Sequence, residues 1–169
     1  MNMDSRSNYL KVYSACLNNA RDLTDEAQVL KKSGGFARAY VLAFTALEEI
    51  SKSQIAADCF TGLINPDKLQ SSFRNHATKI KRVEWVIDSI MDYQHEHGLE
   101  YQGTRPNFET RNKALYVDIG ENNSPVIPED SITEEYVSDL INLVEVGLNE
   151  IWMQTEYWGH QIGTKGFMK

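Results

Sequence analysis

The sequence predicts an all-α protein, an antiparallel bundle of four long helices plus one short helix. Apolar residues recur at alternating steps of three and four along four stretches, which is the period of amphipathic helices. No stretch alternates polar and apolar residues as a strand would. At 169 residues the chain is long enough for one hydrophobic core. We therefore expect a single domain over residues 1–169, with its core at about 7–158 and a mobile tail at 159–169.

The apolar pattern is strongest at residues 34–62, where two adjoining rows share one helix. One row holds Phe36, Tyr40, Ala43, Leu47, Ile50 and Ala57, and the other holds Ala37, Val41, Phe44 and Ile55. Such a helix is covered on most of its circumference, so we expect it at the centre of the bundle. Glu48 interrupts the second row. It either pairs with Lys52, four residues on, or belongs to a functional site.

A first helix is predicted over residues 7–32, and Gly34 and Gly35, just beyond it, are expected to end it. A third helix starts at Asn65 and Pro66, a cap and a first-turn proline, and ends between 92 and 97. A short helix follows from Asn107 to Tyr116, and residues 117–130 form a long connection. The last helix begins at the capping-box spacing of Ser131 and Glu134 and is expected to end at Gly159.

The histidines do not suggest a metal site. His76 occupies the apolar stripe of the third helix, as either a core histidine or a functional imidazole. His95 and His97 are too close together for the zinc-helix motif, and the Glu-x-x-His pairs of carboxylate bundles are missing. The sequence therefore predicts neither a metal nor a cofactor.

Charge is distributed unevenly along the chain. The net charge is −7, which disfavours an overall basic nucleic-acid binder. Residues 114–164 contain no Lys or Arg against ten Asp and Glu, whereas residues 74–82 are basic and contain no acid. The predicted RNA contacts are therefore Arg74, Lys79, Lys81 and Arg82.

The compartment is predicted from what the sequence lacks. It has neither an apolar run of membrane-span length nor the apolar core of a signal peptide. Cys16 and Cys59 fall in helical patterns, as buried apolar thiols do in a reducing compartment. We expect a cytoplasmic protein without a membrane partner.

Three stretches, in this order and at these separations, resemble the AbiV family of bacterial abortive-infection proteins, within the HEPN superfamily. They are Ala46-Leu47-Glu48-Glu49-Ile50-Ser51-Lys52, Phe73-Arg74-Asn75-His76-Ala77-Thr78-Lys79 and Arg111-Asn112-Lys113-Ala114-Leu115-Tyr116-Val117-Asp118. The resemblance implies a HEPN-like fold, a role in anti-phage defence and, commonly, metal-independent RNA cleavage by a homodimer. The usual HEPN motif is Arg, four to six residues, then His. Arg111 and Asn112 match it, and Tyr116 stands where the His would be.

The candidate catalytic residues are Glu48, His76, Arg111, Asn112 and Tyr116. Metal-independent RNA cleavage needs a base, a cation that stabilises the phosphorane, and an acid. Arg111 suits the cation role, unless it forms a surface salt bridge with Glu109 or with a carboxylate elsewhere. Tyr116 is either an acid or hydroxyl donor, or a core aromatic. His76 is the candidate to replace the missing imidazole.

We expect these five residues, with Lys79, to converge on one cleft. Two functions remain open. The first is a ribonuclease or RNA-targeting toxin, and the second is a catalytically silent module that binds RNA, ribosomes or a phage protein. The expected partners are a second copy of the chain, RNA or the translation machinery, and a phage-encoded activator.

Overall fold

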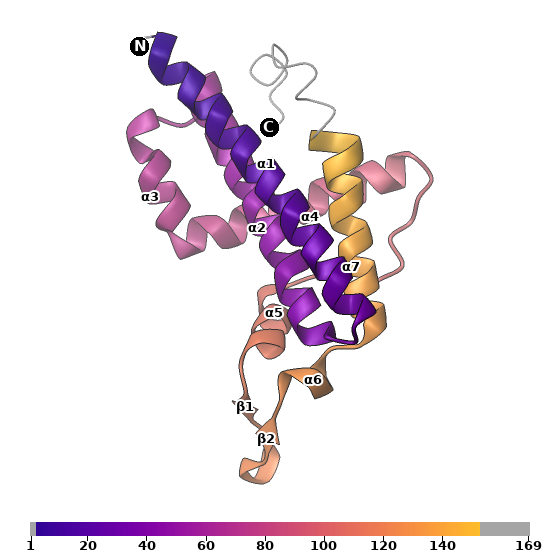
Figure 1. Cartoon of the computed structure of the whole chain (residues 1–169). Coiled ribbons are helices and arrows are strands. Elements are labelled where there is room, and N and C mark those ends of the chain that lie inside the picture. The colour runs from indigo at the N-terminus through magenta and orange to yellow at the C-terminus, as the bar shows by residue number, and fades with distance from the viewer. Residues whose placement is uncertain (1–2, 153–169) are drawn as a thin grey trace.

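The protein, seen in a computed structural model that describes residues 3–152, is built almost wholly of helices (Figure 1). The elements in order are α1 (Met3–Lys32), α2 (Phe36–Thr61), η1 (Pro66–Lys68), α3 (Leu69–Arg74), α4 (His76–Glu96), α5 (Phe108–Leu115), β1 (Asp118–Ile119), η2 (Glu121–Asn123), β2 (Pro125–Val126), α6 (Pro128–Ser131), α7 (Glu134–Val146) and the π-helical η3 (Gly147–Trp152). The all-α prediction is confirmed. The first helix starts at Met3, slightly before the predicted residue 7.

Helix α2 is the centre of the fold. It runs antiparallel to α1 along most of its length, with α7 beside the pair and α4 passing behind it (Figure 1). Both predicted apolar rows are largely buried, and Phe44, Leu47, Ile50 and Ile55 have no exposed surface. Gly34 and Gly62 bound the helix with left-handed backbone, at φ of +80° and +83°, which a side chain would strain. The predicted central helix is therefore confirmed.

The predicted third helix is wrong in one respect, because it is broken at Asn75. The backbone there is extended, at φ −73° and ψ 116°, and separates α3 from α4. The Asn75 side chain accepts a hydrogen bond from the Thr78 N–H at 2.9 Å, which makes Asn75 the N-cap of α4. His76 is therefore the first residue of α4 and not a residue within a continuous stripe.

The start of the last helix is also corrected. Ser131 ends the short α6, and Thr133 caps α7 by accepting a hydrogen bond from the Tyr136 N–H. The predicted end at Gly159 and the predicted tail at 159–169 lie outside the described residues.

The predicted connection at 117–130 contains a small hairpin that projects from the bundle (Figure 1). Strands β1 and β2 are antiparallel, with Asp118 opposite Val126 and Ile119 opposite Pro125. The turn between them uses positive φ at Asn122 and Asn123, a conformation that asparagine tolerates better than most residues. The connection between α5 and α6 is therefore an ordered hairpin and not an irregular loop.

The cysteine and membrane predictions can be compared with the same residues. Cys16 and Cys59 are both buried free thiols, as predicted. Burial, reinforced by the nearby Glu49 carboxylate, raises the pKa of Cys16 to about 12. Within residues 3–152, every helix is too short or too polar to cross a bilayer.

Candidate functional site

Helix α5 carries the motif residues and is fixed against the N-terminal half of α2. Asn107 caps it by accepting a hydrogen bond from the Thr110 N–H at 2.8 Å. The ring of Phe108 meets the ring of Phe44 edge-on, with centroids 4.9 Å apart. The Tyr40 hydroxyl bonds to the Asn107 backbone and the Thr110 side chain, and burial raises the pKa of Tyr40 to about 12. Tyr40 therefore stays protonated at neutral pH, and its oxygen accepts a hydrogen bond from the Asn107 N–H.

Arg111 lies one turn beyond Phe108 and has no acidic partner among the described residues. The predicted alternative, a salt bridge with Glu109, is wrong, because Glu109 pairs with Lys113 at 2.7 Å. The guanidinium of Arg111 makes one long hydrogen bond, from Nη1 to the Asn112 Oδ1 at 3.3 Å. Its Nε is buried and has no hydrogen-bond partner within the described chain. Within residues 3–152, no carboxylate therefore forms an ion pair with Arg111.

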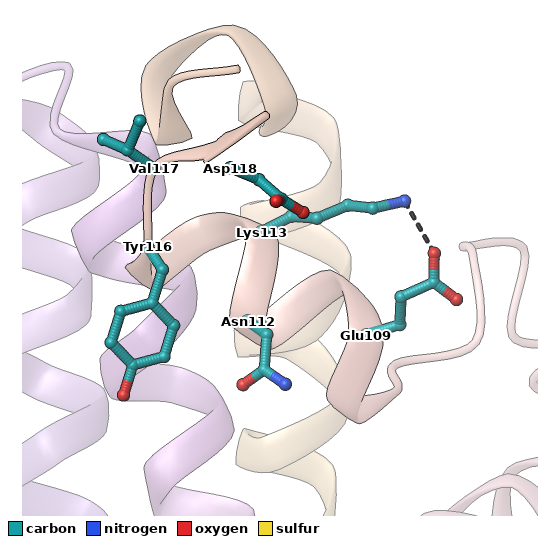
Figure 2. Close-up of a pocket in the computed structure, with 6 residues that line it drawn as sticks. All are labelled: Glu109, Asn112, Lys113, Tyr116, Val117 and Asp118. Carbon is teal, nitrogen blue, oxygen red and sulfur yellow. Dashed lines mark hydrogen bonds and ion pairs between the residues drawn. The ribbon is translucent and has the colours of Figure 1, made fainter. Parts of the chain in front are cut away.

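A pocket of about 430 Å³ opens at the C-terminal end of α5, and Arg111 is not among the residues that line it. Its lining residues are Glu109, Asn112, Lys113, Tyr116, Val117 and Asp118 (Figure 2). Figure 2 shows Asn112 and Tyr116 on the same side, whereas Lys113 extends towards Glu109. Two of the predicted site residues therefore share a hollow.

Tyr116 lies just beyond the end of α5. Its backbone is extended, and its N–H bonds to the Asn112 carbonyl at 2.9 Å. The side chain is 60% exposed, so the alternative of a core aromatic is wrong. The phenol is therefore open to solvent and to any substrate in the pocket.

Glu48 remains a candidate. The predicted pairing with Lys52 is wrong, because Lys52 pairs with the neighbouring Glu49. The half-buried carboxylate of Glu48 has no hydrogen bond or ion pair within residues 3–152. It lies one turn after Phe44 on the same row of α2, close to the level at which α5 packs.

The contacts along α2 do not favour convergence of the α4 residues with Arg111. Arg82 of α4 forms an ion pair with Asp58 of α2. Asp58 is fourteen residues beyond Phe44, which is about 21 Å along the helix axis. The start of α4 and helix α5 therefore meet α2 at different levels. The side chain of His76 lies outside the described part of the structure, so its role and that of Lys79 remain predictions.

The basic segment is divided by these contacts. Arg74 and Lys81 are exposed and Lys79 is half-buried. Arg82 is engaged with Asp58, whose side chain is only 4% exposed, so it has a structural role. An open hollow of about 420 Å³ lies at the α3–α4 break, lined by Gln70, Ser71, Arg74 and Asn75. A basic surface thus survives without Arg82.

Sequence reasoning did not single out the other residues of the pocket. Glu109 and Lys113 are four residues apart, a spacing that was a signal for their ion pair. The hydrogen bond between them raises the pKa of Lys113 and lowers that of Glu109. Val117 and Asp118 gave no signal, because their place depends on the unpredicted hairpin.

Comparison with known proteins bears on the fold and the motif together. A sequence model of the family described as AbiV, of HEPN type, matches residues 8–149. The chain belongs to the AbiV family. The AbiV match runs from α1 into η3 and includes the central α2 and Arg111, Asn112 and Tyr116 of the motif. Searches of curated proteins and of solved structures found no match.

Proposed function

We propose that this AbiV protein acts on RNA in anti-phage defence, as a metal-independent ribonuclease or RNA-targeting toxin. The observation that supports this most directly is Arg111. Its Nε is buried, and among the described residues neither a hydrogen-bond acceptor for Nε nor an ion-paired carboxylate is present, so an anion would complete the site at a gain in free energy. Its planar fork fits two phosphate oxygens at once.

The residues around Arg111 suit the other steps of transesterification. In that reaction the 2′-hydroxyl oxygen attacks phosphorus and gives its proton to a base. The bond from phosphorus to the 5′ oxygen breaks, the leaving oxygen takes a proton from an acid, and a 2′,3′-cyclic phosphate remains. We assign phosphorane stabilisation to Arg111, phosphate orientation to Asn112 and proton donation to the exposed Tyr116 hydroxyl. Glu48, which lies close to the level of α5, is the candidate for the base within one chain; His76 lies on α4, whose start meets α2 at a different level, so its role stays a prediction.

The basic surface at the α3–α4 break supports RNA contact apart from the chemistry. Arg74 and Lys81 are exposed and make no ion pair with the described residues, so both can reach phosphates. Because exposed cations attract phosphates whatever the base sequence, we expect binding that tolerates any sequence and weakens with salt.

The second candidate is a catalytically silent binding module for RNA, ribosomes or a phage protein. It is favoured by the exposed tyrosine in the position of the motif histidine. An unperturbed tyrosine titrates near ~10, so it is a poor base at neutral pH. Without an imidazole, the Arg111 site can hold a phosphate without cleaving it.

The decisive experiment is cleavage of labelled RNA by the pure protein in EDTA, with Lys11→Ala, at an exposed lysine on α1, as the matched control. Arg111→Ala should lower the cleavage rate by about 100-fold or more, because it removes the charge that stabilises the phosphorane. Arg111→Lys should recover only part of the rate, since an ammonium lacks the fork. Lys11→Ala should cleave like the parent. Equal losses in the two alanine variants would assign the effect to general charge and contradict the proposal.

Tyr116→Phe separates the two candidates, because it removes only the hydroxyl. A large fall in cleavage at unchanged melting temperature supports Tyr116 as a proton donor. If the parent protein cleaves no RNA, but Arg111→Ala still loses RNA binding and phage protection, the silent module is correct.

We also propose a homodimer, an RNA or ribosomal target and a phage-encoded activator as partners. The proposal of a dimer is supported by the HEPN resemblance alone. Trp85 packs against the core and the apolar rows of α2 are covered within one chain, so these side chains do not require a second copy to bury them. Light scattering after gel filtration should give twice 19.3 kDa. A constant monomer mass over a wide concentration range would contradict it.

A further inference from the structure

The hairpin carries most of the large apolar side chains that the described chain leaves exposed. Val117 is 65% exposed and Ile119 is 74% exposed, and Ile127 follows at 38%. Tyr116, at the base of the hairpin, adds a fourth. The other exposed large apolar side chains in residues 3–152 are Val29, Leu63 and Leu99, which lie apart in the sequence. A cluster of this kind is typical of an interaction surface, whereas a single exposed residue is not.

Strand register places these side chains on one face. Ile119 lies opposite Pro125, so by the same register Val117 lies opposite Ile127. Residues directly opposite in an antiparallel pair point to the same side, and so do residues two apart in a strand. Val117, Ile119, Pro125 and Ile127 therefore form one apolar face, which we call the hairpin face.

The hairpin face is held in a defined shape. The Gly120 N–H bonds to the Ser124 carbonyl at 2.8 Å, across a turn in which Asn122 and Asn123 adopt positive φ. A Cβ at Gly120 would lie 2.9 Å from a methyl group of Val126, so only glycine allows this approach. A surface already shaped in the free protein loses less entropy on binding.

The charges around the hairpin face are acidic. Asp118, Glu121, Glu129 and Asp130 are all exposed near it. From residue 114 to the end of the described chain there is no Lys or Arg. Of the cations close to this region, Lys113 is paired with Glu109, and Arg38 of α2 lines a hollow with Glu129. Such a rim repels the phosphates of RNA. It also repels a second copy of itself in a symmetric contact.

We propose that the hairpin face is the docking surface for another protein, one that presents an apolar centre surrounded by Lys and Arg. The acidic rim selects a basic partner, and the apolar face supplies the buried area. This inference goes beyond the action on RNA and does not depend on it. Val117 and Asp118 also line the pocket beside Asn112 and Tyr116 (Figure 2), so an occupant of the hairpin face covers one wall of that pocket.

The test uses a fluorescent peptide of alternating leucine and lysine as a probe, titrated with the full chain at physiological salt. The Val117→Ser, Ile119→Ser double variant should bind about ten-fold more weakly or worse, because two apolar contacts are lost. Val29→Ser is the matched control, since Val29 is also 65% exposed but stands alone on α1, and it should bind like the parent. Asp118→Asn with Asp130→Asn should weaken binding and reduce its salt dependence. Asp25→Asn, an exposed acid on α1, controls for net charge.

Two outcomes would overturn the proposal: the hairpin variant binds the peptide like the parent, or a leucine–glutamate peptide binds equally well. Light scattering adds a third, because a dimer that dissociates in the hairpin variant would make a second copy the occupant. If the serine variant has a lower melting temperature, charge reversal of Asp118 and Glu121 to lysine replaces it. That variant should abolish peptide binding while the fold stays intact.

Discussion

Arg82 of α4 and Arg111 of α5 both belong to helices that pack against α2, but the charged groups around the two arginines differ. Arg82 neutralises Asp58, a buried carboxylate on α2. Arg111 forms no ion pair with the residues that the structure describes and leaves its Nε unpartnered among them. The charge of Arg82 is used within the fold, whereas the charge of Arg111 is available to a ligand. Both looked like candidates for RNA contact in the sequence.

The parts of the fold around the two arginines, the C-terminal half of α2 for Arg82 and the end of α5 with the hairpin for Arg111, also differ in burial. Residues 53–59 of α2 are all buried, and Ser51 and Ser53 donate hydrogen bonds to backbone carbonyls one turn earlier. The end of α5 and the hairpin expose apolar side chains and leave charge unbalanced. The first region is organised for stability, and the second carries unsatisfied groups that a partner can complete.

The largest expected effect is on stability, from Arg82→Ala. Removing the cation leaves a buried carboxylate unpaired, which costs about 3–5 kcal/mol. Arg111→Ala breaks no ion pair and should change the free energy of unfolding by less than about 1 kcal/mol. Urea unfolding measures both. Replacing Asp58 and Arg82 together with leucine should be less harmful than Arg82→Ala alone, and equal costs for Arg82→Ala and Arg111→Ala would erase the contrast.

A second, smaller effect is that the stability lost in Arg82→Ala should depend on pH. Burial raises the pKa of Asp58 above its ordinary value, and Arg82 offsets part of the rise. A raised pKa means that the folded state binds the proton more tightly. The stability from this group is therefore present below the ordinary pKa and is lost as pH rises through the folded pKa.

Without Arg82 the pKa of Asp58 rises further, so more stability is lost at neutral pH. The difference between the parent and Arg82→Ala should shrink by about 1 kcal/mol or more between pH 7 and about pH 4. Urea unfolding at both pH values, with Lys113→Ala as the control, measures this. A constant difference would mean that Asp58 stays ionised throughout.

The smallest effect concerns how α5 is held. Tyr40→Phe leaves the Asn107 backbone N–H without the hydroxyl oxygen that accepts from it and should cost about 1 kcal/mol. Because that contact orients α5, RNA cleavage or binding should fall with it. Tyr9→Phe, on α1, is the control and should alter neither. Thermal unfolding and the RNA assay together decide, and full activity in Tyr40→Phe would show that α5 is oriented by Phe108 alone.

The sequence predicts the helices well where local chemistry and periodicity agree. Gly34, Gly62 and Asn107 mark helix ends by conformations or caps that few other residues supply, and the structure uses all three. The break at Asn75 was missed because the apolar stripe continues across it. A cap inside a periodic pattern cannot be distinguished from an ordinary polar position until packing turns the chain.

The candidate site was less predictable than the helices, because the role of each side chain depends on which residues packing places beside it. Glu48 and Glu49 are both within a turn of Lys52, and only packing shows that Glu49 takes the lysine. The ion pair of Arg82 joins residues twenty-four apart, which no local pattern reveals. The hairpin was missed because strands of two residues are too short to show alternation. What sequence did supply was the Arg111 motif.

The complete enclosure of α2 has a consequence for hydrogen exchange. Helices α1, α4, α5 and α7 all rest on it, so its backbone amides cannot reach solvent while the others stay in place. Amides at 46–59 should exchange with deuterium only when the whole domain opens, at a rate set by global stability. Amides at 108–127 should exchange earlier, through local opening. The same chain therefore has one segment that reports on global unfolding and another that reports on the site.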